Sequence, residues 1–387
     1  MKIGYTTVCI NPTFPIKPAG FIQQTQEIFE FHDDLQAYIL AFEDSDTLYY
    51  HVSLDSLGVA LEVQETLGRM LVECLVTNKQ IIVTVSATHT HFAGDSKVVE
   101  YQKEILSAIM NGIQSIEMVE YDSLAISYQC VPFMGVGKSR ISGHEANVLL
   151  QLFTIYADDK PLINMIVHNC HPTIHHGETP YFTSEYPGYV ISELSKKYPN
   201  VFFTFLQGAA GDVSTRFTRP SQDYVAVEYL GNKLISKLEE LMNQESKKVP
   251  LNKIEYESTM VPLEHEFNPI DLSNLSNNLT ERELETIHIG VRVREDLSTK
   301  LETLDKSVMI SKLELGPYKL VFCPNEAFSS YIDCIDTNKA ALVCYSNGYS
   351  PYITGINNDF ITYEKFTDTV TKTSKQDYMR VLNKYGH

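Results

Sequence analysis

The 387-residue sequence has little positive charge. Its 31 lysine and arginine residues stand against 49 aspartate and glutamate residues, and the formal net charge is -18. Proteins that bind nucleic acid or an anionic membrane need a basic face, so this charge balance excludes both classes of partner. The substrate is therefore expected to be neutral, cationic or bound through a metal. The charge indicates no particular oligomeric state.

Long apolar runs and paired cysteines are also missing. No stretch of about 18 apolar residues is present, and a membrane-spanning helix needs that length. Pro12, Pro15 and Pro18 interrupt the N-terminal segment early, so no secretory signal is expected. The seven cysteines are odd in number and include no Cys-x-x-Cys pair, which argues for buried, reduced thiols. These absences predict a soluble, cytoplasmic protein.

Strand-like and helix-like patterns alternate along the chain. Two short strands that acidic turn residues separate, 37–42 and 47–53, predict a hairpin. Further strands are expected at 81–86, 124–131, 148–156, 162–167, 201–206, 308–315 and 318–323, and helices at 57–76, 98–116, 189–197 and 224–243. No linker or internal repeat interrupts the pattern. It predicts an α/β fold over residues 1–387, a single large domain of mixed β-sheets packed with flanking helices, with the active site at strand ends.

One segment stands apart from this pattern. Residues 268–306 are polar and rich in asparagine, serine, glutamate and leucine, which is typical of surface helices. A plain surface insertion is the favoured interpretation, and a lid over the site is the alternative.

Histidines gather in two stretches that each close an apolar run. Six of the 12 histidines lie in residues 89–91 and 168–176. His89 and His91 follow the predicted strand 81–86, and the period of two along a strand sends both to one side, where they can address one metal or its bound water. His171 follows the strand 162–167 and is the other natural imidazole donor. A His-x-His pair alone is more often incidental, so the second cluster is what favours a metal.

Three further histidines accompany the second cluster: His168, His175 and His176. They either line the cleft, hold a second metal or belong to a loop. The loop interpretation is the favoured one.

Two oxygen ligands for a metal can be proposed from later motifs. Catalytic zinc takes three or four N, O or S ligands and keeps a position for water. Glu326 lies just past a buried strand and at the expected start of a helix, where a glutamate commonly just complements the helix dipole. Tyr352 belongs to a pair of tyrosines around a proline, which usually pack, yet a phenol beside zinc can ionise and bind it.

Two more motifs are candidates for catalysis. Gly211-Asp212-Val213-Ser214 follows the strand 201–206, where glycine lets the backbone approach a ligand and the serine hydroxyl can face a cleft. A helix N-cap or a tight turn is the plainer interpretation of that serine. The Gly135 to Arg140 stretch lacks the spacing of a phosphate loop. Lys138 or Arg140 is instead expected to place positive charge against a developing oxyanion.

In this order, along nearly the whole chain, these motifs resemble the amidase domain of the neutral/alkaline (non-lysosomal) ceramidases, in a short bacterial-type form. The family's Ala-Thr-His-Thr-His motif is matched without a change by residues 87–91. The other matching segments are Ile10-Asn11-Pro12, His32-Asp33-Asp34-Leu35, Val52-Ser53-Leu54-Asp55, Cys170-His171-Pro172-Thr173, Tyr186-Pro187-Gly188, Gly211-Asp212-Val213-Ser214, Pro324-Asn325-Glu326 and Tyr349-Ser350-Pro351-Tyr352-Ile353-Thr354.

The resemblance implies a role for each matched residue. One Zn²⁺ per chain would be held by four ligands: His89, His171, Glu326 and Tyr352. His91 would lie by the zinc-bound water, Ser214 would be catalytic, and Tyr363 would be a further tyrosine of the active site.

The sequence also departs from the family pattern. Gly137-Lys138-Ser139 stands where many relatives have Asn-Arg-Ser, so the cationic contact to substrate is weakened at Lys138 or moved to Arg140. Phe92-Ala93-Gly94 replaces a glycine-rich stretch, and we expect this protein to have neither the family's C-terminal immunoglobulin-like domain nor its secretion signal. These changes leave the implied zinc site intact and leave the lipid substrate open.

Zinc-dependent hydrolysis of a carboxamide (N-acyl) bond is therefore the predicted function. The substrate is a small-molecule or lipid-like amide that need not be ceramide. His91 would accept the proton, and the nucleophile is either zinc hydroxide or Ser214. The alternatives are a zinc esterase or phosphoesterase, and a catalytically inactive metal-binding protein.

Overall fold

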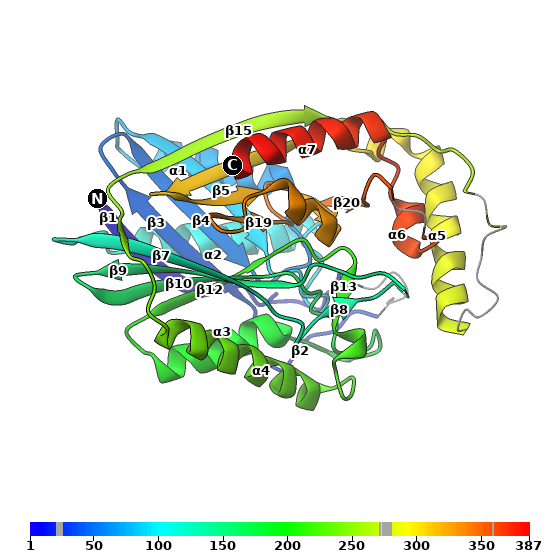
Figure 1. The fold of residues 1–387 in the computed structure, drawn as a ribbon, viewed down its shortest axis with the longest axis horizontal. Helices are drawn as coiled ribbons and strands as arrows, with labels where there is room; N and C mark the ends of the chain where they lie inside the picture. The colour runs from blue at the N-terminus through cyan, green and yellow to red at the C-terminus, as the bar shows by residue number, and fades with distance from the viewer. Residues whose placement is uncertain (21–25, 142, 271, 273–280, 358–359) are drawn as a thin grey trace.

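Strands fill the middle of the molecule and helices lie along its outside in the computed structural model (Figure 1). The structure describes residues 1–20, 26–141, 143–270, 272, 281–357 and 360–387, without the side chains of 281–283. The predicted α/β class with mixed sheets is confirmed, because parallel and antiparallel strand pairs occur in the same sheets. The assignment of residues 1–387 to one domain stays a prediction.

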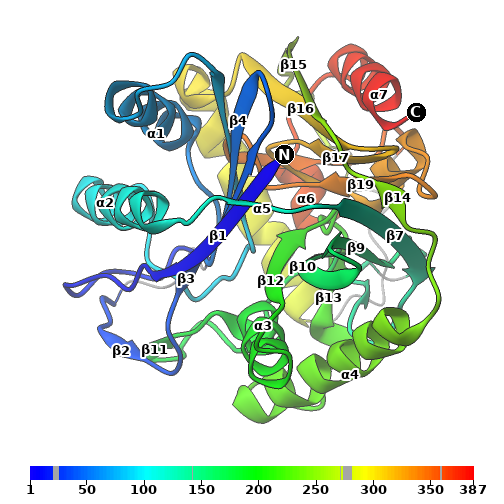
Figure 2. The ribbon, with the colours of Figure 1, turned by 90° about the vertical axis from the view of Figure 1, so that its left-hand side faces the viewer.

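The first sheet has the strand order β5-β4-β3-β1-β6. Its strands are β1 (Lys2–Cys9), β3 (Gln36–Glu43), β4 (Thr47–Leu54), β5 (Gln80–Ala87) and β6 (Val119–Glu120). The predicted hairpin is confirmed as the antiparallel pair β3 and β4. Helix α1 (Leu61–Cys74) connects β4 to its parallel neighbour β5, and α2 (Val99–Ser115) lies beside α1 on the outer side of this sheet (Figure 2).

The second sheet has the order β12-β10-β9-β7-β14. Its strands are β7 (Leu124–Pro132), β9 (Leu149–Ala157), β10 (Lys160–His168), β12 (Phe202–Gln207) and β14 (Val249–Pro250). Helix α3 (Glu185–Lys197) links β10 to its parallel neighbour β12, and α4 (Tyr224–Asn243) packs beside α3. Leu230, Leu234 and Leu238, at helical spacing along α4, are fully buried in the apolar layer between these helices and the sheet.

The third sheet has the order β15-β16-β17-β19 and lies under the C-terminal helix α7 (Lys372–Gly386). Its strands are β15 (Ile254–Pro262), β16 (Ser307–Leu315), β17 (Tyr318–Phe322) and β19 (Ala340–Val343). Gly316, with φ of 64°, makes the predicted turn between β16 and β17. One apolar cluster, which includes Phe42, Leu206 and Leu320, joins the three sheets, so the strand ends beside it are rigidly placed.

Three short strand pairs bring distant segments together, and the sequence pattern did not indicate them. They are β2 (Glu30–Phe31) with β11 (Tyr181–Phe182), β8 (Lys138–Ser139) with β13 (Val213–Ser214), and β18 (Asn325–Ala327) with β20 (Ser350–Ile353). The expectation that Glu326 begins a helix is wrong, because Glu326 lies in β18 and a 3₁₀ helix begins only at Ser329. Pairing with β20 decides the conformation there, since three residues are too few to show a strand period.

The polar segment 268–306 forms a surface helix, α5 (Glu281–Thr299), at one end of the molecule beside α6 (Tyr363–Thr367) (Figure 1). Residues 271 and 273–280 of this segment lie outside the described residues. Arg294 on α5 donates hydrogen bonds to the carbonyl oxygens of Phe366, at 3.2 Å, and Asp368, at 3.3 Å. Whether the segment is an insertion or a lid stays a prediction.

Two expectations from composition can be compared with the structure. No helix in the described part of the chain combines the length and apolar character that a bilayer crossing requires. All seven cysteines are free, and four are buried: Cys170, Cys323, Cys334 and Cys344. Cys9 and Cys74 are exposed, so the expectation of a buried thiol is wrong at these two positions.

Candidate metal centre

The three predicted imidazoles of the site meet where strands of the first two sheets end. His89 and His91 follow β5, and His171 follows β10. Their metal-binding atoms all lie within 4.8 Å of one another. His89 and His171 are fully buried, and their ring centroids are 4.6 Å apart. The predicted placement of the site at strand ends is therefore what the structure shows.

A main-chain carbonyl oxygen fixes the orientation of each of the three rings. Each imidazole pairs Nδ1 with a carbonyl oxygen: His89 with Leu57 at 2.6 Å, His91 with Gly20 at 2.8 Å and His171 with Ala210 at 2.7 Å. A carbonyl oxygen only accepts, so the proton of each neutral ring lies on Nδ1 and the lone pair lies on Nε2. Such carbonyl contacts fix the tautomer and orientation of metal-binding histidines.

Glu326 faces two of these rings from β18. Its Oε2 lies 3.1 Å from His171 Nε2 and 3.4 Å from His89 Nε2. Burial opposes ionisation of this carboxyl, but the neighbouring His89 and His171 hold the pKa of Glu326 well below its usual range. An anionic carboxylate therefore faces the Nε2 atoms.

Burial also governs the imidazoles. It lowers the pKa of His171 to about 4, with the nearby Arg140 charge acting in the same direction and Glu326 opposing. Burial and the two neighbouring histidines lower the pKa of His91 in the same way. A neutral His171 ring at neutral pH points its lone pair at an anionic oxygen 3.1 Å away, which is unfavourable unless a cation lies between them.

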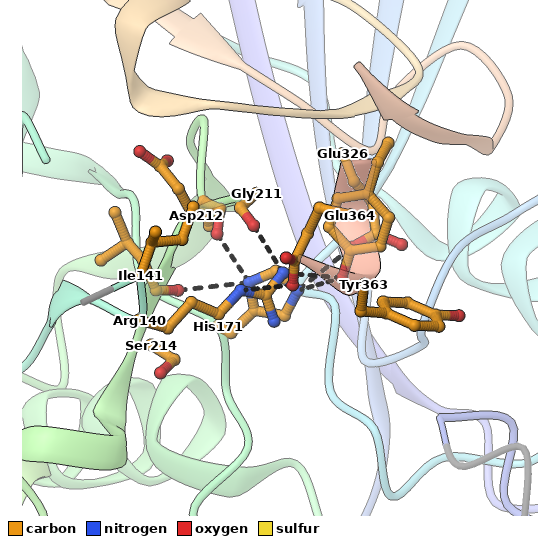
Figure 3. Close-up of polar contacts among 12 residues, drawn as sticks. Arg140, Ile141, His171, Gly211, Asp212, Ser214, Glu326, Tyr363 and Glu364 are labelled. Carbon is orange, nitrogen blue, oxygen red and sulfur yellow. Dashed lines mark hydrogen bonds and ion pairs between the residues drawn. The ribbon is translucent and has the colours of Figure 1, made fainter. Parts of the chain in front are cut away.

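Tyr352 and the positively charged side chain of Arg140 complete the group. The phenol oxygen of Tyr352 lies 3.5 Å from His171 Nε2 and accepts a hydrogen bond from Arg140 Nη2 at 2.8 Å. Arg140 Nε forms an ion pair with Glu364 Oε1 at 3.1 Å. Figure 3 shows Arg140 directed at Glu364, with Tyr363 beside Glu364. Five predicted residues thus lie together with Arg140: His89, His91, His171, Glu326 and Tyr352.

Solved structures of known proteins share this architecture. A ceramidase complexed with C2 superposes on the chain with a TM-score of 0.75 at 12% sequence identity, over 100% of this chain and 74% of that chain. The neutral ceramidase from Pseudomonas aeruginosa gives a TM-score of 0.74 at 13% identity with the same coverage. The chain has the fold of the neutral ceramidases. The resemblance predicted from the motifs is confirmed at the level of the fold, although no family model and no curated protein matches the sequence.

In this ceramidase fold Arg140 brings a cationic side chain to the site. Lys138 lies on β8 with its side chain exposed, and no contact described for it reaches the histidines. Arg140, two residues further on, passes between Gly211 and Tyr352. The structure therefore supports the alternative in which the positive charge moved from Lys138 to Arg140, and a catalytic role for Lys138 stays a prediction.

Ser214 lies next to the candidate metal centre, but its hydroxyl makes no described hydrogen bond to the three histidines. It pairs with Lys138 across β8 and β13 and forms an isolated bridge with His171. Its hydroxyl accepts a hydrogen bond from Arg216 N at 3.3 Å as the N-cap of a 3₁₀ helix, and no hydrogen bond described for it reaches the three histidines. Figure 3 shows the hydroxyl directed away from the His171 ring. The N-cap interpretation is confirmed, and the catalytic one stays a prediction.

Tyr363 begins α6 and packs its ring edge-on against Tyr352, with centroids 6.0 Å apart. Burial and the neighbouring carboxylates raise its pKa. Tyr363 therefore lies at the site, and its function stays a prediction.

The extra histidines form no second centre of this kind. Among the residues that the structure describes, only the triad brings three such ligand atoms together. His168 pairs its Nδ1 with Leu149 O at 2.7 Å, and His175 pairs its Nδ1 with Glu185 Oε1 at 2.9 Å. His168 ends strand β10, so the loop interpretation is wrong for it, whereas His175 lies in a loop and is buried there.

Sequence reasoning missed several residues that pack around the site. The Tyr345 ring stacks on His89 at 3.9 Å between centroids, and Tyr349 donates a hydrogen bond to Glu326 Oε1 at 2.6 Å. His89 itself has φ of 66°, a backbone conformation that is costly outside glycine and is held here by surrounding contacts. Of these residues, only Tyr349 could have been found from the sequence, because it is the first tyrosine of the motif that runs from Tyr349 to Thr354.

Proposed function

We propose that this protein is a member of the neutral ceramidase family that uses zinc to hydrolyse a carboxamide (N-acyl) bond. The observation that carries the proposal is the group of three imidazoles whose Nδ1 atoms are all committed to carbonyl oxygens and whose ligand atoms lie within 4.8 Å. The likeness to two solved ceramidases supports an amide bond as the target.

The residues present fit a divalent cation. Imidazole nitrogen, carboxylate oxygen and phenol oxygen are donor types that zinc accepts, and the buried Nε2 of His89 has no hydrogen-bond partner among the described residues. The ligands would be His89, His171, Glu326 and Tyr352. When bound, zinc polarises a carbonyl group and lowers the pKa of its water to about 7.

The protein's own groups then have separate tasks. His91, with Nδ1 held by Gly20 O, presents Nε2 as the acceptor for the proton of the attacking group. Arg140 brings positive charge close to the Tyr352 phenol, where it can stabilise a developing oxyanion. Ser214 would need a rotamer change to act, because its hydroxyl now caps a helix.

The metal content of the purified protein tests the proposal first. We expect about one zinc per chain by elemental mass spectrometry in wild type purified without added metal, and none in His89→Ala prepared identically. Comparable metal in both proteins, or none in a correctly folded wild type, would overturn the zinc hydrolase and leave shared fold alone.

Substrate and nucleophile need separate experiments. A panel of acyl amides, acyl esters and phosphate esters should show turnover of amides, and turnover of phosphate esters alone would contradict an amidase. Mass spectrometry during rapid turnover decides the nucleophile. An acyl adduct on Ser214 would support covalent catalysis, and its absence would favour direct attack by activated water.

A further inference from the structure

The two oxygens of the Glu326 carboxylate have different environments. Oε2 faces His171 Nε2 and His89 Nε2, at 3.1 and 3.4 Å. Oε1 accepts the hydrogen bond of the Tyr349 hydroxyl at 2.6 Å. A carboxylate held at one oxygen cannot rotate freely, so this hydrogen bond keeps Oε2 directed at the imidazoles.

Tyr349 is itself held in place by the loop between β4 and α1. A Cβ atom added at Gly58 would lie 2.3 Å from Tyr349 Cγ, so the tyrosine ring lies directly on the glycine backbone. The preceding residue, Leu57, supplies the carbonyl oxygen that fixes His89. Two adjacent residues of one loop therefore support His89 directly and Glu326 through Tyr349.

We infer that Tyr349 is a positioning residue that orients the Glu326 carboxylate for metal binding. This inference rests on the proposed function, since it needs zinc at the centre. Residues that hydrogen-bond to metal ligands typically change metal affinity by about 10- to 100-fold when mutated. Tyr349 acts through Glu326 and is not itself a ligand.

Tyr345 offers a matched control. It is also buried beside the centre and stacks on His89, but its hydroxyl has no hydrogen-bond partner among the described residues. Tyr345→Phe therefore removes a hydroxyl without removing a hydrogen bond, whereas Tyr349→Phe removes the one that holds Glu326. Both variants keep the aromatic ring.

Zinc affinity, measured by competition with a chromogenic chelator at constant pH, tests the inference without any substrate. We expect Tyr349→Phe to bind zinc about 10- to 100-fold more weakly than wild type, and Tyr345→Phe to bind it as wild type does. Gly58→Ala should also weaken binding, because its methyl group displaces the Tyr349 ring. Circular dichroism checks that each variant is folded.

The outcomes separate the two proposals. Equal affinity of wild type and Tyr349→Phe would overturn the positioning role and leave the proposed function standing. An equal loss in Tyr349→Phe and Tyr345→Phe would also overturn it, because general disturbance of the aromatic layer would then explain both. If wild type binds no zinc, the proposed function fails and this inference fails with it. If Tyr349→Phe does not fold, Gly58→Ala decides by the same criterion.

Discussion

Two buried glutamates face histidines in this protein, and their surroundings differ. Glu326 meets the Nε2 atoms of His89 and His171, whereas Glu185 meets the Nδ1 atom of His175 at 2.9 Å. Glu185 also accepts main-chain hydrogen bonds from Ile174 N and His175 N. No main-chain donor is described for the Glu326 carboxylate.

This difference separates a structural cluster from the proposed metal centre. Glu185 accepts hydrogen bonds from the main chain of residues 174 and 175 and contacts the His175 ring, so it clamps these two residues in place. Glu326 faces rings whose N–H groups are already used by carbonyl oxygens, so a cation is the natural partner. Burial of a carboxylate beside a histidine is thus uninformative until the protonated nitrogen is known.

Removal of one ligand should give the largest effect in this comparison. We expect His171→Ala to contain no zinc and to lose amide hydrolysis by roughly 100-fold or more, because the metal's contribution is worth several kcal/mol. His175→Ala, from the other cluster, should keep about one zinc per chain. Elemental mass spectrometry and a rate assay check this pair, and zinc loss in both variants would contradict the separation.

The Glu185 cluster should instead affect stability. Glu185→Gln leaves buried N–H groups facing an amide NH₂, and we expect it to lower the free energy of unfolding by about 3 kcal/mol while zinc content is unchanged. Glu193→Gln is a control on the same helix, where the partly exposed Glu193 pairs with Lys196 at 2.6 Å. It should cost less than about 0.5 kcal/mol in urea denaturation. Intact stability of Glu185→Gln would disprove the clamp.

Metal removal should distinguish the clusters again, with a smaller effect. If free zinc exceeds its Kd by about 100-fold, binding stabilises the native state by about 2.7 kcal/mol. Chelation should therefore lower the Tm of wild type and leave the Tm of His171→Ala unchanged. Calorimetry checks this, and an equal shift in the two proteins would place the stabilising metal elsewhere.

A third carboxylate–histidine pair, nearer the surface, should show the smallest effect. The hydrogen bond between His144 and Asp212, at 3.1 Å, raises the pKa of His144 above its ordinary value. Its stabilisation is then fully present below the unfolded pKa, about 6.5, and is lost as pH rises through the folded pKa.

His144→Gln should accordingly destabilise the protein by less than about 1 kcal/mol at about pH 5.5 and by less still at about pH 9. Urea denaturation at the two pH values measures the difference. A larger loss at the higher pH would show that the neutral ring is the stabilising form.

The sequence by itself determined where the main strands around the site lie along the chain and that the imidazoles follow them. His89, His91 and His171 each follow an apolar strand, and the ends of buried strands are where side chains can meet, so local pattern was sufficient. Most strands and helices, including β16 and β17 with their Gly316 turn, were also predictable from periodicity.

Only the tertiary structure decided how the other side of the site is built. The strands that carry Glu326 and Tyr352 are too short for a periodic signal, and they form because they pair with each other. The contact of Tyr349 with Glu326 and that of Arg140 with Glu364 join residues far apart in the sequence. Such contacts depend on which donor faces which acceptor in three dimensions, and composition and spacing along the chain carry no record of that.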